Sequence, residues 1–228
     1  MVSLMNGTYQ KIWTAAGWAV LGVLTLAGVT PANAGVILSP VSVPISTLGG
    51  STTAHIIDET GLSSLFISGV TDYDSYVASN PTHLPLQFGI SNPNAWLSGT
   101  NFGGKFMVFD LGHNDNILSF ALWNQTGGGG VKSFTLSSAM DQNFTTGVTS
   151  LGTFTAAVGL TVQSFTITVP ATGEFVKLQI NTNYGNGNVN MGEVAFDVTP
   201  VPEPAAMTVL GLGLAGIGLV RRKRTWAL

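Results

Sequence analysis

The sequence predicts an all-β domain of the jelly-roll β-sandwich class, flanked by an N-terminal signal peptide and one C-terminal transmembrane helix. Three observations predict this arrangement. Short apolar segments alternate with runs rich in Gly, Ser, Thr and Asn, and no segment of the central chain keeps a helical period over three turns. Several segments alternate apolar and polar residues, which is the period of a half-buried strand. The two longest apolar segments lie near the two ends of the chain.

The first 34 residues are expected to form a secretory signal peptide. Lys11 precedes an apolar segment at 12–29, and Ala32 and Ala34 form the A-x-A pattern after which a signal peptidase cleaves. The alternative is a first transmembrane helix. Small residues at the cleavage pattern and the lack of a stop-transfer charge after it favour the signal peptide.

Residues 35–200 are expected to form a single exported domain. This domain holds three cations, Lys105, Lys132 and Lys177, against ten carboxylates, so its formal charge is −7. That balance disfavours nucleic acid as a partner and is compatible with cations and neutral, hydroxyl-rich ligands. The chain has no cysteine, which excludes disulfides and thiolate metal sites, so the hydrophobic core must hold the domain together.

The expected strands of this domain are short and regularly spaced. The clearest is 164–169, where Phe165, Ile167 and Val169 alternate with hydroxyl residues. The segment at 105–111 is apolar on both faces, which favours a central strand. The other expected strands are 36–45, 86–90, 116–123, 131–137, 151–157, 174–180 and 193–198. Strands at this spacing favour a sandwich or jelly roll over an α/β fold.

The last 28 residues carry a different pattern. Val201-Pro202-Glu203-Pro204 leads into an uncharged apolar span at 205–220, and the basic run Arg221-Arg222-Lys223-Arg224 follows. A helix over the span would be about 24 Å long, which crosses a bilayer core if flanking residues snorkel or the bilayer thins. The basic run would stay on the cytoplasmic side, so the chain before it is expected outside.

This order of Pro-Glu-Pro, apolar span and basic stop resembles the PEP-CTERM sorting signal of Gram-negative bacteria. The resemblance implies a partner, an exosortase, which is a membrane protease that recognises Pro-Glu-Pro and releases or transfers the protein to the exterior. An ordinary single-pass anchor would keep the topology without the processing. The expected localisation is therefore export through the inner membrane to the cell surface or exterior, with the C-terminal helix as a transient membrane anchor.

Within the exported domain, a series of segments follows a recognisable order: FMVFDLG at 106–112, LWN at 122–124, VKSFTLSS at 131–138, DQNFT at 141–145, EFVKLQI at 174–180 and GEVAF at 192–196. In order and spacing they resemble the galactose-binding-like jelly rolls, which include discoidin domains and many carbohydrate-binding modules. The resemblance covers a little over half of the exported domain. It implies a non-catalytic, glycan-binding fold.

The same resemblance implies a structural calcium ion, bound by an early loop and by a glutamate near the final strand. Glu193 matches the late position, and Asp72 and Asp74 in the loop at 71–75 match the early one. Calcium takes six to eight oxygen ligands, so backbone carbonyls would have to complete the site. The alternative is a solvated turn, because the D-x-D pattern is common in loops.

A glycan site needs a flat aromatic face with amide or carboxylate groups beside it. The candidates for the aromatic face are Trp96, Tyr73, Tyr76 and Tyr184, whereas Trp123 is expected in the core because it ends an apolar strand. Sugar-binding members of the family commonly use an Arg or His in their loops, and this domain has no Arg.

The sequence thus predicts a non-catalytic protein of the cell surface or extracellular matrix that associates with extracellular polysaccharide, in the biofilm and exopolysaccharide context that the sorting resemblance implies. The alternative is a structural or adhesive surface protein that binds other proteins. A third class, a polysaccharide-active enzyme, is disfavoured because the sequence shows no G-x-S-x-G, no H-E-x-x-H and no acid/base pair.

Overall fold

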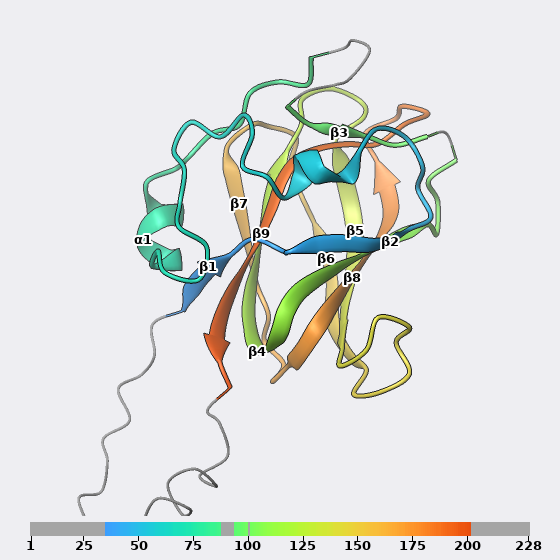
Figure 1. Ribbon diagram of the computed structural model, residues 1–228. Helices are drawn as coiled ribbons and strands as arrows, with labels where there is room; N and C mark the ends of the chain where they lie inside the picture. Colours follow the sequence, from blue (N-terminus) through green and yellow to red (C-terminus); the bar gives the residue numbers. More distant parts are fainter. Residues whose placement is uncertain (1–34, 88–93, 100, 202–228) are drawn as a thin grey trace, which may run out of the picture. The chain divides into compact units, whose positions relative to one another are not determined.

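The computed structural model describes residues 35–87, 94–99 and 101–201. In these ranges the chain forms a β-sandwich with two short helical segments, η1 (Thr53–Ile56) and α1 (Tyr73–Ala78) (Figure 1). The predicted all-β sandwich is therefore confirmed. The expected signal peptide and the expected helix at 205–220 lie outside the described residues. Among the described residues, no helix has both the length and the apolar character needed to span a membrane.

The described strands run in chain order through the sandwich. They are β1 (Val36–Leu38), β2 (Ser42–Ser46), β3 (Trp96–Leu97), β4 (Phe106–Asn124), β5 (Val131–Ala139), β6 (Thr149–Thr155), β7 (Val162–Thr166), β8 (Thr172–Asn183) and β9 (Asn190–Pro200). All neighbouring pairs in the sheets are antiparallel. The strands expected at the end of the chain are present and extend further than predicted.

The long strand β4 takes part in both layers of the sandwich. Its first part pairs with β2 and β8, and β8 continues through β5 to β6. Its second part pairs with β7 and β9, and β9 also pairs with β1 and β3. The register with β8 shifts between Asp110 and Asp115, and Gly112 in this stretch has a φ of 87°, which favours glycine.

Several of the expected strands differ from the structure. The predicted strands at 105–111 and 116–123 are one strand with an irregularity, because β4 exchanges its partner β8 for β9 without leaving the ladder. The predicted strand at 36–45 is interrupted at Pro40 and forms β1 and β2, which pair with different strands, β9 and β4. Of the predicted strand at 86–90, residues 86 and 87 are not in a strand and the rest lie outside the described residues.

The main core lies between the two layers. Val176, Leu178 and Ile180 of β8 are fully buried, as their alternation predicts. Phe120 of β4 packs against Phe134 of β5, with ring centroids 5.5 Å apart. Phe196 and Phe165 contact the same Phe120 ring, so aromatic side chains from four strands meet at the centre of the sandwich.

A second apolar cluster lies on the outer side of β9 and the second part of β4. Trp123 of β4 and Ala195 of β9 belong to it, together with side chains of the segment 53–84, which we call the covering segment. The indole N–H of Trp123 donates a hydrogen bond of 3.0 Å to the carbonyl oxygen of Pro81, which ties this segment to the sheet. Both faces of β9 are therefore buried, and this burial determines the environment of every side chain on that strand.

Candidate functional site

Two carboxylates of β9 lie beneath the covering segment. Side chains alternate along a strand, so Val194, Phe196 and Val198 face the main core, and Glu193, Ala195 and Asp197 share the opposite face. Glu193 has no exposed surface and Asp197 is 7% exposed. One oxygen of each carboxylate, Oε1 of Glu193 and Oδ1 of Asp197, is buried without a hydrogen-bond partner. Buried charges of this kind need a partner.

Glu193 is held by the turn that follows η1. Its Oε2 atom accepts a hydrogen bond of 2.9 Å from the backbone N–H of Glu59. Burial raises the pKa of Glu193 well above its ordinary value, and the nearby negative charges of Asp58 and Glu59 act in the same direction. Both effects act against the charged form of the Glu193 carboxyl group.

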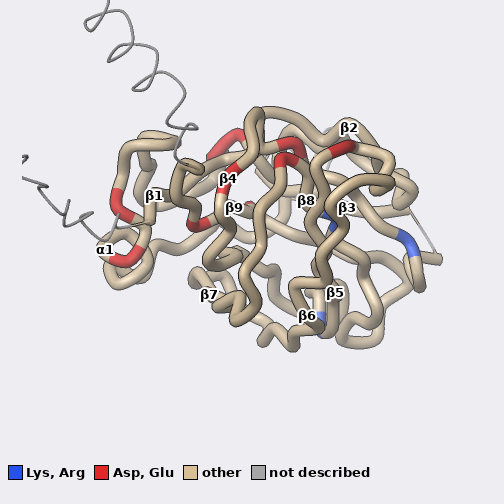
Figure 2. Tube along the Cα trace, turned by 90° about the horizontal axis from the view of Figure 1, so that it is seen from below, with Lys and Arg blue, Asp and Glu red and all other residues tan. Residues whose placement is uncertain are grey.

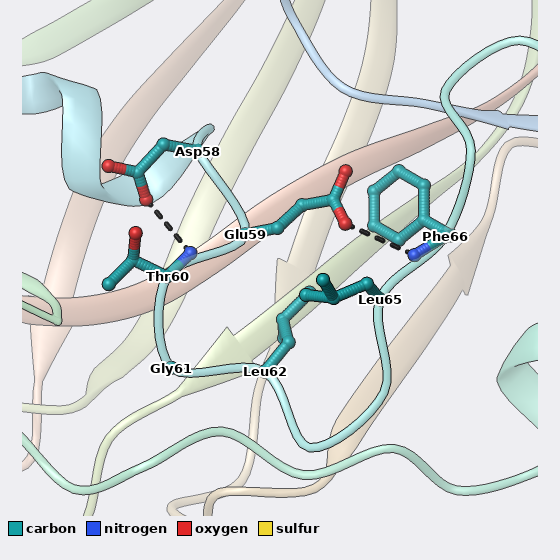
Figure 3. A pocket seen from close by; sticks show the side chains of 7 residues that line it. All are labelled: Asp58, Glu59, Thr60, Gly61, Leu62, Leu65 and Phe66. Atoms are coloured by element: carbon teal, nitrogen blue, oxygen red, sulfur yellow. Dashed lines mark hydrogen bonds between the residues drawn. The ribbon is translucent and has the colours of Figure 1, made fainter.

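Glu59 also forms part of the wall of an open pocket of about 580 Å³ (Figure 3). The pocket is lined by Asp58, Glu59, Thr60, Gly61, Leu62, Leu65 and Phe66. The Glu59 carboxylate accepts a hydrogen bond of 3.1 Å from the backbone N–H of Phe66, and Asp58 accepts one of 2.9 Å from that of Thr60. Burial also raises the pKa of Glu59. The pocket thus combines two carboxylates with apolar side chains, of which Leu65 is exposed.

The predicted calcium ligands do not come together as expected. Asp72 is the N-cap of α1, and its Oδ1 atom accepts a hydrogen bond of 2.8 Å from the backbone N–H of Ser75. The charges of Asp72 and Asp74 act on Asp197, whereas those acting on Glu193 come from Asp58 and Glu59. In the part of the chain that the structure describes, no three His, Asp or Glu side chains form a group that could hold a metal ion.

Three of the four predicted sugar-stacking side chains are buried. Trp96 has no exposed surface, because β3 pairs with β9 and its indole enters the main core. Tyr73 and Tyr76 are 2% and 6% exposed and belong to the cluster beneath the covering segment. The hydroxyl of Tyr73 forms a hydrogen bond of 2.8 Å with Ser164. These three rings offer no face to a ligand, which corrects the prediction for them. Trp123 lies in the core as predicted.

Tyr184 is the fourth candidate, and it is 38% exposed. It lies just after β8, and its hydroxyl donates a hydrogen bond of 2.7 Å to the carbonyl oxygen of Ala156. The ammonium of Lys132 lies 5.5 Å from the ring centroid, which is a cation–π distance. The ring is therefore fixed at its hydroxyl end and still presents surface to solvent.

The chain around Tyr184 in the sequence is rich in asparagine. The side-chain N–H₂ of Asn183 donates to the carbonyl oxygens of Asn186 and Asn188, at 2.8 and 2.7 Å. The neighbouring glycine run at 127–130 lies against this loop, because the carbonyl oxygen of Gly128 accepts a hydrogen bond of 3.1 Å from the backbone N–H of Asn186. A Cβ at Gly129 would come within 2.8 Å of Asn190, so the close approach requires glycine.

The covering segment also carries exposed apolar side chains. Leu65, Ile67 and Val70 are 68%, 67% and 67% exposed, and all three lie within six residues of the chain. Leu65 lines the pocket beside Glu59 (Figure 3). This apolar loop is separate in sequence from the loop at 184–189 between β8 and β9, which we call the Tyr184 loop, and it offers a different kind of surface.

The profile of the PEP-CTERM protein-sorting motif matches residues 200–224. The chain carries a PEP-CTERM sorting signal. This signal implies export and processing by an exosortase at the membrane. The PEP-CTERM signal begins where β9 ends, at Pro200, which is paired with Asp115 of β4. No curated protein sequence matches the chain.

Several solved structures are similar to this chain. The C-terminal domain of a chitobiase from Bacteroides fragilis is 13% identical, with a TM-score of 0.49, and the match covers 72% of this chain and 99% of that one. The family 32 carbohydrate-binding module of Clostridium perfringens NanJ, in complex with galactose, is 17% identical, with a TM-score of 0.38 and coverages of 45% and 74%. The family 32 module of AlyQ, in complex with 4,5-unsaturated mannuronic acid, is 19% identical, with a TM-score of 0.38 and coverages of 45% and 75%.

Proposed function

We propose that the exported domain is a non-catalytic module that binds neutral extracellular polysaccharide at the cell surface or in the extracellular matrix, in a biofilm or exopolysaccharide context. The observation that carries this proposal is the Tyr184 loop. It combines one fixed, partly exposed aromatic ring with two asparagines of the same loop, Asn186 and Asn188, and Asn183 holds the backbone of that loop in place.

The chemistry of this loop fits a sugar better than a charged ligand. The face of an aromatic ring packs against the C–H groups of a sugar, and side-chain and backbone amides bond to its hydroxyls. The loop itself carries no charged side chain, and Lys132 is the cation that lies over the ring. The domain is acidic, with a formal charge of −7, which repels anionic polymers at low salt. A neutral polysaccharide is therefore the proposed ligand.

Changing Tyr184 to alanine is expected to weaken binding to the ligand polysaccharide by about tenfold or more, because the stacking surface is lost. The measurement is a glycan array that includes the producing strain's own exopolysaccharide, probed with residues 35–201. Tyr184→Phe is the matched control, because it keeps the ring and removes only the hydrogen bond to Ala156. Binding by the alanine variant equal to that of the wild type would remove Tyr184 from the site, and no binding by the wild type would contradict the proposed function.

A second candidate function is adhesion to other proteins, and the apolar loop of Leu65, Ile67 and Val70 favours it. Exposed apolar side chains grouped in this way are typical of protein interaction sites. The two functions separate in one comparison. If polysaccharide binding is absent, and if Leu65→Ser with Ile67→Ser abolishes attachment of cells to one another while Tyr184→Ala leaves it unchanged, adhesion is the function.

We also propose that the domain binds a structural calcium ion at Glu193, together with Asp58 and backbone carbonyl oxygens of the turn after η1, instead of Asp72 and Asp74. Two observations support it. The buried Oε1 atom of Glu193 has no partner, and the carboxylates of Asp58 and Glu59 add negative potential at the same place. A hard cation with oxygen ligands would satisfy all of these groups.

Calcium is expected to raise the melting temperature of residues 35–201 by about 5–10 °C when its concentration is about 100 times the dissociation constant. The measurement is a thermal melt with millimolar calcium and again with EDTA. Glu193→Gln is expected to abolish the difference, and Asp72→Asn, the matched control, is expected to keep it. A melt that calcium and EDTA leave unchanged would exclude this site.

A further inference from the structure

Asp197 is the second carboxylate on the outer face of β9. The charged groups that act on it differ from those that act on Glu193. Its side chain is more than nine-tenths buried, and its Oδ1 atom has no hydrogen-bond partner. Acidic residues are its neighbours: Asp74 and Asp72 lie at α1, beside β1 (Figure 2). Burial, together with the charges of Asp74 and Asp72, raises the pKa of Asp197 to about 6.

The Oδ1 atom of Asp197 is directed at the backbone of Gly35. A Cβ atom built on Gly35 would lie 1.7 Å from this oxygen, so the carboxylate touches the glycine Cα, and any other residue would clash. The strand register explains the contact. Ile37 is paired with Asp197, and Gly35, the residue before β1, lies two residues earlier and therefore on the same side of the chain as Ile37.

Gly35 itself is held in place by its carbonyl oxygen. That oxygen accepts a hydrogen bond of 3.1 Å from the backbone N–H of Tyr73, the first residue of α1. The next residue, Val36, pairs with Val198 on one side and forms a bridge with Asp72 on the other. The nitrogen of Gly35, one bond from the Cα that meets Asp197, therefore lies next to this carboxylate, and Asp72 and Asp74 add negative charge around Asp197.

The domain has few cations to neutralise these carboxylates. It contains no arginine and only three lysines. Two of the lysines, Lys132 and Lys177, lie over the rings of Tyr184 and Phe144. Gly35 is also the residue that follows the predicted signal-peptidase pattern at Ala32 and Ala34. After cleavage, the chain would therefore begin with a positively charged group beside the buried carboxylate of Asp197.

We propose that cleavage after Ala34 creates an α-ammonium group on Gly35 and that this new N-terminus forms an ion pair with Asp197. Asp72 and Asp74 add negative charge around the pair. In the cleavage, water adds to the carbonyl carbon of Ala34, the bond to the Gly35 nitrogen breaks, and Ala34 leaves as a carboxylate. The released amine takes a proton, because an α-amino group ordinarily has a pKa of about 7.7–8.0.

The pair would make the mature fold more stable than that of the precursor. In the precursor the Gly35 nitrogen is a neutral amide, and it cannot neutralise a buried carboxylate. After cleavage the ammonium donates charge-assisted hydrogen bonds, which are about twice as strong as neutral ones. Removal of the signal peptide would thus complete the packing of β1 and α1 on β9, and the domain would reach full stability only after export.

The test uses the full chain, expressed with its own signal and purified after export. Mass spectrometry is expected to find Gly35 as the first residue. Inserting one glycine between Ala34 and Gly35 moves the ammonium by one residue, and it is expected to lower the melting temperature by about 5 °C or more. In an Asp197→Asn background the same insertion is expected to change the melting temperature little, because each change removes the same ion pair. A first residue other than Gly35, or melting shifts that simply add, would overturn the proposal.

A second measurement does not depend on the stability of the variants. An amine-reactive reagent at neutral pH labels a free N-terminus quickly and a paired, half-buried one slowly. Labelling of the Gly35 amine, followed by mass spectrometry, is expected to be at least several-fold slower in the wild type than in Asp197→Asn. The lysines of the same molecule serve as the internal reference. Equal rates at Gly35 in the two proteins would show that Asp197 does not hold the ammonium.

Discussion

Replacing Trp96 with alanine is expected to destabilise residues 35–201 by about 3–5 kcal/mol, because the change leaves a large cavity in the main core. Trp96 has no exposed surface, and β3, which carries it, is only two residues long and is joined to β9 at Met191. A loss of this size is a large fraction of the usual total stability of a domain. The measurement is urea unfolding followed by circular dichroism, since Trp123 would still contribute to fluorescence.

Trp96→Phe is the control for this experiment. It keeps an aromatic ring in the cavity and removes the indole N–H, which is buried without a partner, so a much smaller loss is expected. An alanine variant with an unchanged unfolding midpoint would contradict the position of Trp96 in the core. The result also matters for binding experiments. If Trp96→Ala lost polysaccharide binding, the cause would be unfolding of the domain, so the loss would not place Trp96 in the binding site.

The double change of Pro202 and Pro204 to alanine is expected to leave most of the chain in the membrane fraction. Proline fixes its own φ and disfavours a helical conformation in the residue before it, so Pro-Glu-Pro is expected to offer an extended segment to a protease. Alanine is the best helix former, and the double variant would let the helix expected at 205–220 continue into the motif. The measurement is the ratio of released to membrane-bound protein in cells that contain the exosortase.

The control for the sorting experiment is Thr208→Ala, which changes a residue of the expected span and keeps the Pro-Glu-Pro element. It is expected to be released like the wild type. Normal release of the double proline variant would mean that the exosortase does not process the chain at this motif. Loss of release in both variants would point to a defect of membrane insertion instead.

The sequence predicted the sandwich and most of its strands because period-two alternation is a local property. Val176, Leu178 and Ile180, and likewise Val194, Phe196 and Val198, lie on the core face as their spacing indicates. The boundaries were less predictable where the cause is distant. The division of β1 from β2 and the continuity of β4 depend on which strand each segment pairs with, and no local pattern carries that information.

The candidate site was harder to predict for the same reason. Glu193 was expected to take part in a site, but its partners Asp58 and Glu59 lie more than a hundred residues earlier and meet it through a turn. Trp96 and Tyr73 looked like exposed loop aromatics, because neither the two-residue strand β3 nor the covering segment has a regular hydrophobic period, yet Trp96 enters the main core and Tyr73 the second apolar cluster. The signal that was available is the acidic pair Glu193 and Asp197, two positions of one face in a strand that is otherwise apolar.

The placement of β9 has a mechanical consequence. Its first residue, Asn190, follows the Tyr184 loop, and its last, Pro200, leads directly into the sorting signal. A polymer held at Tyr184 by a chain attached to the membrane beyond Pro200 would pull along the axis of this strand. Hydrogen bonds between antiparallel strands are perpendicular to the strands, so such tension would load the whole ladder between β9 and β4 at once instead of opening it bond by bond. The domain would then act as a tether that resists shear between a cell and its matrix.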